Sequence, residues 1–187
     1  DDGVLFSWDM EGKDQRKIME DTPLPSFVVG GMVYSVGFLD YNLTRIDPAT
    51  GEATVLLDDC AVVHTDGKHL FFAEKETYHL YRCDLDGSNR TLLYGERILP
   101  ASINADDEEY VYFSRYDSNN ALNPEGNKIY RVKKTPGSQP EVVADMGMPV
   151  FQFYFFYQCD LMMFRSDSNS LYTARRDGSD LRKLELP

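Results

Sequence analysis

The sequence predicts an all-β fold, a β-propeller of four-stranded antiparallel blades, and three observations support this prediction. A hairpin pattern recurs five times along the 187 residues. A more apolar pair of strands lies between successive hairpins. Tyr and Phe, which favour strands, occur 12 and 11 times, and no stretch keeps a helical period. We therefore expect strands throughout the chain and no helices.

The recurring hairpin consists of a short strand, a turn of the Asp-Gly or Pro-x-x-Gly type and a second strand. Its five copies begin at Leu5, Leu43, Leu80, Ile129 and Leu171. Successive copies start 37 to 49 residues apart, which is the length of a four-stranded propeller blade. The hairpins are rich in charged residues, and so we place them at the outer rim.

The strand pairs between the hairpins are more apolar and are joined by tight turns. Near-continuous apolar runs are typical of strands that are covered on both faces, as the inner strands of a blade are. The predicted pairs are Phe27–Val29 with Met32–Gly37, Ala61–His64 with His69–Ala73, Ile98–Asn104 with Tyr110–Ser114, and Val150–Tyr157 with Leu161–Phe164.

These units predict a single propeller domain over residues 1–187, with about four complete blades and one two-stranded partial blade. The blade-like units are about 1–21, 22–58, 59–97, 98–146 and 147–187. A propeller avoids exposed sheet edges by closing its ring. The incomplete first unit therefore indicates a piece of a larger propeller, a five-bladed ring with one degenerate blade, or completion by a partner subunit.

Composition excludes several classes of partner. The formal net charge is −12 and the sequence pI is about 4.6, so the surface repels nucleic acid and anionic membranes. No apolar run approaches the roughly 20 residues that span a bilayer. Cys60, Cys83 and Cys159 are odd in number and match no zinc spacing, and we expect buried or half-buried thiols. No metal or other cofactor is expected.

The repeat resembles a widespread group of bacterial propellers of unassigned function, related to the YWTD propellers of low-density-lipoprotein receptors. The inner-strand element of that group is matched by Met32-Val33-Tyr34-Ser35, Leu70-Phe71-Phe72-Ala73 and Val111-Tyr112-Phe113-Ser114, and more weakly by Leu161-Met162-Met163-Phe164. The outer-strand element is matched by Leu80–Ser88 and Leu171–Ser179. No copy has the full Tyr-Trp-Thr-Asp, so a receptor role does not carry over. The resemblance implies a secreted or cell-surface bacterial protein, one module of a larger polypeptide.

The long insertion Arg115–Lys128 joins the second and third strands of its blade. Such connections lie on the same face as the links between blades, around one mouth of the central channel, and long loops on a rigid scaffold often bind ligands. Aromatic, carboxylate and guanidinium groups there could hold a sugar ring or a peptide. Alternatively, they serve blade-to-blade contacts or a solvated surface. The predicted ligand-binding residues are Arg115, Tyr116, Asn119, Asn120, Phe38, Tyr41, Glu74, Tyr78, Arg97 and Arg165.

Signs of catalysis or metal binding are few. Asp84-x-Asp86-Gly87-Ser88-Asn89 resembles the start of a calcium loop, but Gly95 stands where such a loop needs a Glu, and turn geometry explains the Asp-Gly. His64, His69 and His79 fall within one repeat. We therefore expect a non-catalytic, exported binding or scaffold module for a protein or a glycan. The alternatives are a carbohydrate-active hydrolase or lyase that uses carboxylates at the channel mouth, and a purely structural spacer.

Overall fold

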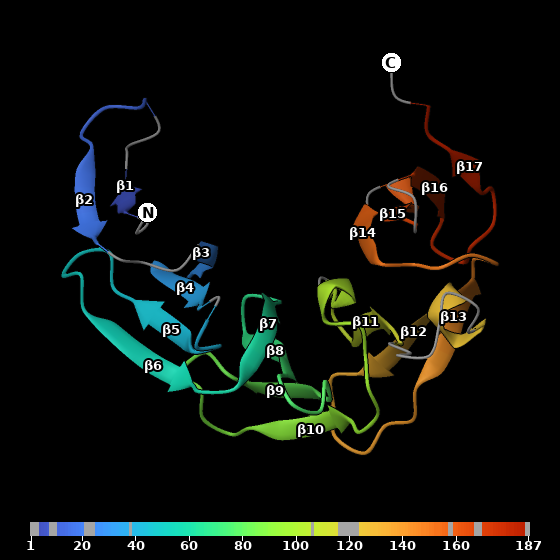
Figure 1. The fold of residues 1–187 in the computed structure, drawn as a ribbon, viewed down its shortest axis with the longest axis horizontal. Coiled ribbons are helices and arrows are strands. Elements are labelled where there is room, and N and C mark those ends of the chain that lie inside the picture. The colour runs from blue at the N-terminus through green and yellow to red at the C-terminus, as the bar shows by residue number, and fades with distance from the viewer. Residues whose placement is uncertain are drawn as a thin grey trace.

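The computed structural model of the chain describes residues 4–7, 11–20, 25–37, 39–105, 107–115, 124–156, 159–166 and 170–185. These residues form strands β1 to β17, arranged in five antiparallel sheets, and two short 3-10 helices. Each sheet is one blade, and the blades follow one another in chain order (Figure 1). The predicted all-β propeller is confirmed.

The blades are numbered 1 to 5 along the chain. Blade 1 is the hairpin β1 (Leu5–Ser7) and β2 (Arg16–Met19). Blade 2 contains β3 (Pro25–Val29), β4 (Met32–Val36), β5 (Leu43–Ile46) and β6 (Ala53–Leu57). Blade 3 contains β7 (Cys60–Thr65), β8 (His69–Glu74), β9 (Leu80–Asp84) and β10 (Thr91–Tyr94). Blade 4 contains β11 (Tyr110–Ser114), β12 (Lys128–Lys133) and β13 (Glu141–Asp145). Blade 5 contains β14 (Gln152–Phe156), β15 (Leu161–Arg165), β16 (Leu171–Arg175) and β17 (Arg182–Lys183).

Blades 2 to 5 share the same strand register. The second and third strands of these blades pair at equivalent positions, Val33 with Ile46, Leu70 with Cys83, Val111 with Val132 and Met162 with Ala174. Two residues further along the second strand, blades 3, 4 and 5 place a Phe opposite a Tyr. The rings stack with interplanar angles of 16 to 18°, as Phe72–Tyr81, Phe113–Tyr130 and Phe164–Tyr172. Such cross-strand pairs stabilise a sheet on one face.

Blade 4 departs from the prediction at its first strand. The expected strand Ile98–Asn104 is replaced by isolated bridges, Ile98 to Arg115 and Asn104 to Tyr112, around the 3-10 helix η1 (Pro100–Ser102). Pro100 favours this because proline has no N–H for a ladder. The buried Ser102 compensates, since its hydroxyl accepts a 2.8 Å hydrogen bond from the Ser114 N–H. The expectation of no helices was therefore wrong for η1 and for η2 (Pro124–Asn127).

The hydrophobic core lies between blades rather than within any one of them. One buried cluster joins blades 2 and 3 through Tyr34, Leu43, Leu70 and Phe72, among others. A second joins blades 3 and 4, and a third joins blades 4 and 5. A single blade cannot bury its apolar faces alone, and so the stacking of neighbours supplies most of the stability.

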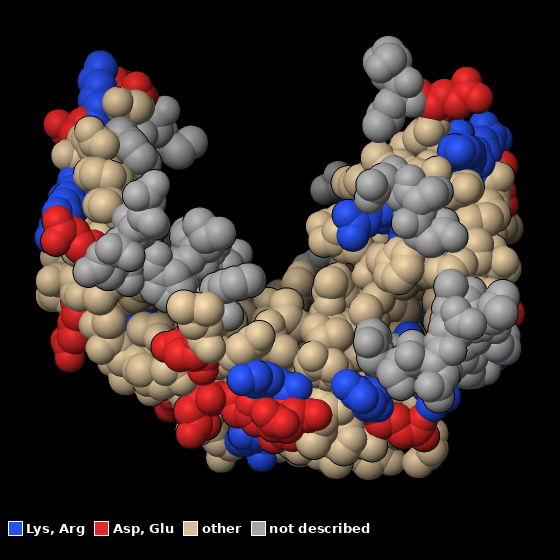
Figure 2. All heavy atoms as spheres, in the orientation of Figure 1, with Lys and Arg blue, Asp and Glu red and all other residues tan. Residues whose placement is uncertain are grey.

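The five blades curve into an arc with their first strands on the inside and their last strands on the outside (Figure 1). β1–β2 stands at one end and β14–β17 at the other, and these two ends do not meet in this view (Figures 1 and 2). Acidic and basic side chains lie side by side over the lower middle of the arc in Figure 2. Within the described residues, no helix is long and apolar enough to cross a membrane.

Candidate functional site

The predicted channel-mouth face contains two tyrosines with the same backbone role. Tyr41 and Tyr78 each precede a third strand by two residues and adopt left-handed φ values of 57° and 56°. The carbonyl of Tyr41 accepts a hydrogen bond of 2.8 Å from the N–H of Cys60 in the next blade. The carbonyl of Tyr78 accepts an equivalent bond of 3.0 Å from the N–H of Ile98. Both tyrosines therefore join consecutive blades.

The side chains on this face also contact one another. The Lys75 ammonium lies 4.0 Å from the centre of the Tyr41 ring, and the Arg97 guanidinium lies 4.9 Å from that of Tyr78. Cations above aromatic rings attract electrostatically. These contacts pair residues at the junctions of blades, which is the alternative role that the sequence left open.

The charged candidates on this face form ion pairs. Glu74 pairs with Arg90, and Arg115 pairs with Glu96. The carbonyl of Arg165 accepts a 3.1 Å hydrogen bond from the Phe151 N–H. Phe38, Tyr116, Asn119 and Asn120 lie outside the described residues. A ligand-binding role for the ten predicted residues stays a prediction.

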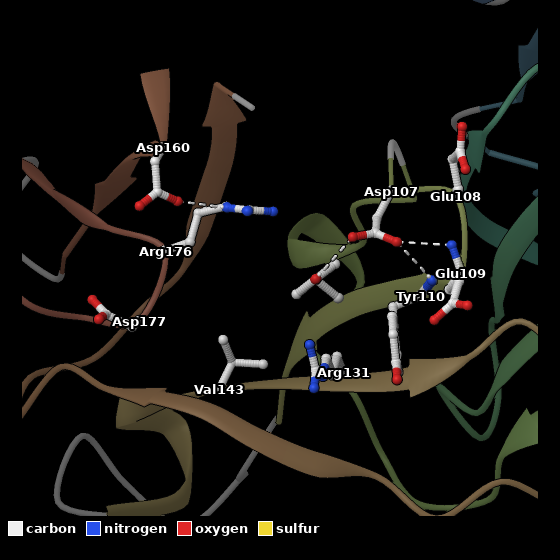
Figure 3. Close-up of a pocket in the computed structure, with 10 residues that line it drawn as sticks. Asp107, Glu108, Glu109, Tyr110, Arg131, Val143, Asp160, Arg176 and Asp177 are labelled. Carbon is white, nitrogen blue, oxygen red and sulfur yellow. Dashed lines mark hydrogen bonds and ion pairs between the residues drawn. The ribbon is translucent and has the colours of Figure 1, made fainter. Parts of the chain in front are cut away.

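A pocket of about 830 Å³ lies at the opposite mouth, between blades 4 and 5 (Figure 3). It is formed by the turns that join first to second strands and third to fourth strands, together with the adjoining strand residues. Five of its lining residues are acidic and two are arginines. The lining residues are Asp107, Glu108, Glu109, Tyr110, Tyr112, Arg131, Val143, Asp160, Arg176 and Asp177.

One wall of the pocket is the turn before β11, which Asp107 holds in place. Its Oδ1 accepts hydrogen bonds from the backbone N–H groups of Glu109, at 2.8 Å, and Tyr110, at 3.1 Å (Figure 3). Its Oδ2 accepts a bond of 3.1 Å from the hydroxyl of Tyr112. Burial and the negative charge of Asp107 raise the pKa of Tyr112. The Tyr112 phenol therefore stays a neutral donor to this carboxylate.

Arg131 forms the floor of the pocket in Figure 3. Its guanidinium lies 4.2 Å from the centre of the Tyr110 ring, and two of its nitrogens donate to one oxygen of Glu141 at 2.8 and 3.0 Å. The hydrogen bonds to Glu141 raise the pKa of Arg131. Arg131 is thus a fixed cation beneath a half-buried aromatic ring.

The other wall belongs to blade 5. There the Arg176 Nε donates a 2.9 Å hydrogen bond to Asp160 Oδ1 (Figure 3). Asp177 caps its own turn, because its Oδ1 accepts bonds from the backbone N–H and the hydroxyl of Ser179 at 2.9 and 2.6 Å. The hydrogen bonds from Ser179 lower the pKa of Asp177.

Contacts at the earlier blade junctions show how such turns can be joined. The Tyr34 hydroxyl of blade 2 donates to the Leu85 carbonyl of blade 3 at 2.9 Å. Arg82 of blade 3 donates to the Lys134 carbonyl of blade 4 at 2.8 Å. By register, Arg176 is the turn residue of blade 5 that corresponds to Leu85 and Lys134, and its side chain is paired with Asp160 within its own blade. Arg131 and Arg176 both line the pocket at this last junction.

A second pocket of about 550 Å³ lies at the same mouth, between blades 3 and 4. It shares Asp107, Glu108 and Glu109 with the first pocket, so this acidic turn forms a ridge between the two. Its inner wall contains the buried Lys134, whose Nζ donates to Asp66 Oδ2 at 2.6 Å and to the Ala105 carbonyl at 2.9 Å.

The Asp66 carboxylate of this second pocket is strongly stabilised in its charged form. Burial alone would raise the pKa of Asp66. The hydrogen bond from Lys134, those from the backbone N–H groups of His69 and Lys68, and the positive charge of Lys134 outweigh burial. The pKa of Asp66 is consequently about 2.

The structure also places the turn that resembles a calcium loop and one of the three histidines. Within the described residues, no group of three or more His, Cys, Asp or Glu is placed to hold a metal ion. The Asp86 carboxylate accepts the N–H of Ser88 at 2.9 Å, which confirms the turn role that the sequence suggested for this Asp-Gly. His69 Nδ1 lies 3.6 Å from Asp66 Oδ2, beside the 550 Å³ pocket.

The sequence prediction placed the binding face at the mouth opposite these pockets. It followed the longest insertion, whereas the pockets are formed by short turns. The signal that could have found them is the run Asp107-Glu108-Glu109, three adjacent carboxylates in a turn that needs only one for capping. The partner residues Arg131, Lys134 and Arg176 belong to other turns and strands, and only the fold brings them together.

Comparison with known proteins places the fold among the β-propellers. No known protein family and no curated protein matches the chain. Among solved structures, the chain resembles one from a nidogen–laminin complex, a YWTD propeller, with a TM-score of 0.67 and 13% identity over 92% of this chain and 69% of that one. It also resembles an oligogalacturonate lyase from Vibrio parahaemolyticus, with a TM-score of 0.64 and 15% identity over 98% of this chain and 60% of that one. The N-terminal domain of Nup159 matches with a TM-score of 0.61 and 13% identity, over the whole of this chain and 60% of that one.

These similarities define the class of protein. The chain is a β-propeller, and it spans 69% of the chain from the nidogen–laminin complex and 60% of the lyase and Nup159 chains. One of these comes from a binding complex and another is a lyase. At identities of 10 to 15%, the similarity shows a shared fold and nothing further.

Proposed function

We propose that this protein is a non-catalytic binding module that engages its ligand at the mouth lined by the 830 Å³ pocket. The observation that carries the proposal is the pocket itself, a concave site between two rigid blades with aromatic and charged lining groups. Preorganised sites of this kind bind without the entropic cost of ordering a loop.

The lining chemistry favours a ligand with positive charge. Asp107, Asp160 and Arg131 are engaged within the protein, as described above. The Glu108 and Glu109 carboxylates, in contrast, have no hydrogen-bond or ion-pair partner among the described residues, and they project from the ridge between the two pockets. With a net charge of −12, the whole molecule also attracts cations. A polypeptide segment that contains Lys or Arg therefore fits this mouth better than an acidic glycan does.

The test is a screen for ligands followed by substitution at the mouth. The chain would be applied to a library of basic, neutral and acidic peptides and to an array of neutral and acidic glycans. For a basic peptide, Glu109→Lys should weaken binding about tenfold or more, since it reverses one contacting charge. The matched control is Glu76→Lys, an acidic residue in a turn at the predicted opposite mouth. Weaker binding with Glu76→Lys and unchanged binding with Glu109→Lys would assign the ligand to the other mouth.

A carbohydrate-active enzyme is the second candidate, and the similarity to an oligogalacturonate lyase favours it. Lyases and hydrolases of glycans need charged groups that converge on the reacting bond. Incubation with oligogalacturonate and with neutral oligosaccharides, followed by chromatography of the products, separates the two candidates. Shortened products that disappear in the Arg131→Ala variant would replace the binding proposal with catalysis.

We also propose that the protein works outside the cytoplasm as one module of a larger polypeptide. This part of the proposal rests on the resemblance of the blade repeat to secreted bacterial propellers. Detection of the native protein in cell fractions is the measurement that decides it.

A further inference from the structure

The pocket of about 550 Å³ between blades 3 and 4 has a basic side and an acidic side. Blade 3 contributes Lys68 and His69 from the turn between β7 and β8. Blade 4 contributes Glu108 and Glu109 from the ridge before β11. Lys68 and His69 line this pocket and not the 830 Å³ one. The mouth therefore contains a basic group that a purely cationic ligand would not use.

The charges at the base of this pocket are balanced within the protein. Lys134 donates to Asp66 across the junction of the two blades, and both side chains are nearly buried. Asp66 Oδ1 also accepts the backbone N–H groups of Lys68 and His69 at 2.9 and 2.8 Å. The Thr65 hydroxyl donates to the His69 carbonyl at 2.8 Å. These bonds fix the turn from which the Lys68 side chain projects.

The charges nearer to solvent are not balanced in this way. Lys68, Glu108 and Glu109 are exposed. Within the described part of the chain, the Lys68 ammonium forms no hydrogen bond or ion pair, and neither do the two Glu carboxylates. Figure 3 shows these carboxylates pointing in opposite directions from their turn. Because Lys68 and the carboxylates line one pocket without meeting, a ligand that lies between them can contact both.

We propose that the 550 Å³ pocket binds an acidic side chain of the same ligand whose basic side chain is bound at the ridge; this rests on the function proposed above. The Lys or Arg of the ligand contacts Glu108 and Glu109, and its Asp or Glu forms a charge-assisted hydrogen bond with Lys68. A second basic residue in this pocket would instead lie beside Lys68, and like charges in contact disfavour binding. The ligand class is therefore a polypeptide segment with a basic and an acidic residue close in sequence, and not a run of basic residues.

Peptides of equal length on a neutral background test the proposal. One set contains a single Lys, a second contains Lys and Glu one to four positions apart, and a third contains two Lys at the same spacings. Fluorescence anisotropy with the 187-residue chain should show the best Lys/Glu peptide binding about tenfold tighter than the single-Lys and Lys/Lys peptides. Lys68→Glu should reverse this order, so that Lys/Lys peptides bind about tenfold tighter than Lys/Glu peptides.

The matched control is Lys183→Glu, which makes the same change of charge at an exposed position on β17. It should keep the wild-type order, and circular dichroism would confirm that both variants are folded. Single-Lys peptides that bind as tightly as Lys/Glu peptides, or an order that Lys68→Glu leaves unchanged, would overturn this inference and leave the proposed function standing. Failure of every basic peptide to bind would reject the proposed function itself, and this inference with it.

Discussion

Lys134 and Asp66 show how single side chains join the blades of this protein. Lys134 belongs to the turn after β12, and Asp66 belongs to the turn after β7, 68 residues earlier. Their side chains are only 9% and 11% exposed. Buried partners of this kind depend on each other, because the loss of one leaves an unpaired charge in a region of low dielectric.

We expect Lys134→Met to lower the free energy of unfolding at pH 7 by about 3 kcal/mol, as for other broken buried ion pairs. The pKa of Asp66 is about 2 in the folded chain, below the value of about 3.9 in an unfolded chain. The stabilisation from ionised Asp66 is therefore complete above about pH 4 and is lost as the pH falls toward 2. The difference between wild type and variant should narrow over the same range, as measured by urea unfolding.

The control for this prediction is Lys68→Met, which removes an exposed lysine from the same turn as Asp66. Its effect should stay within about 0.5 kcal/mol at all pH values. A deficit for Lys134→Met that is constant from pH 7 to pH 3 would contradict a role for the Asp66 charge.

At the scale of elements, a blade contacts the preceding blade through its outer hairpin turn. Gly51, Gly87 and Gly178 hold equivalent positions in these turns, all with positive φ. A Cβ on Gly87 would lie 3.0 Å from the carbonyl oxygen and 3.1 Å from the Cβ of Leu56 in blade 2. The Asp-Gly signal in the sequence thus has two causes, a left-handed turn and close packing on the preceding blade.

Gly87→Ala should therefore destabilise the chain more than Gly137→Ala does. Gly137 also adopts a positive φ, of 77°, but a Cβ there meets nothing within 4 Å. We expect about 1 kcal/mol for Gly137→Ala from backbone strain alone. We expect about 3 kcal/mol for Gly87→Ala, since overpacking adds to the strain. Thermal unfolding of both variants measures the difference, and equal losses would refute the packing role.

At the scale of the whole molecule, the interior is divided among the junctions between blades. Cys60 and Cys83 lie in the cluster between blades 2 and 3, fully buried, whereas Cys159 is exposed. Burial raises the pKa of the Cys60 thiol to about 12, with a contribution from Cys83. Burial, followed by the charge of Asp84, raises that of Cys83 to about 12 as well. Neither thiol forms the reactive thiolate near neutral pH.

Reaction with a disulfide reagent at pH 8 should therefore modify one thiol rapidly in the native protein and all three after denaturation. The two slow thiols should react at the rate at which the junction between blades 2 and 3 opens. A Cys159→Ser variant provides the control and should lack the rapid phase. Rapid reaction of a second thiol in the native protein would show that this junction is open in solution.

Much of the architecture could be predicted from the sequence because a propeller is a repeat of local hairpins. The Asp-Gly turns at Asp86-Gly87 and Asp177-Gly178 need only residues close in the chain, and both were placed correctly. The strand predicted at Ile98–Asn104 failed for an equally local reason, since its apolar residues are right for a strand but Pro100 and Ser102 favour the 3-10 turn.

The candidate site could not be predicted in the same way. Tyr41, Tyr78 and Arg115 have suitable chemistry for a ligand, but their contacts at the blade junctions depend on neighbours from other segments. The pocket between Asp107 and Arg176 likewise exists only because two turns far apart in the chain meet at one mouth. No local pattern encodes such a distance.

By itself, the sequence determined the fold class, the blade period and the turns, because hydrogen bonding and strand alternation act over a few residues and are repeated. Only the tertiary structure decided which turns line the two pockets and which lysine is buried. Those features depend on how one blade is placed against the next, through packing and ion pairs between residues as far apart as Asp66 and Lys134. Such contacts form only when the blades have stacked, and for this reason no repeating sequence pattern predicts them.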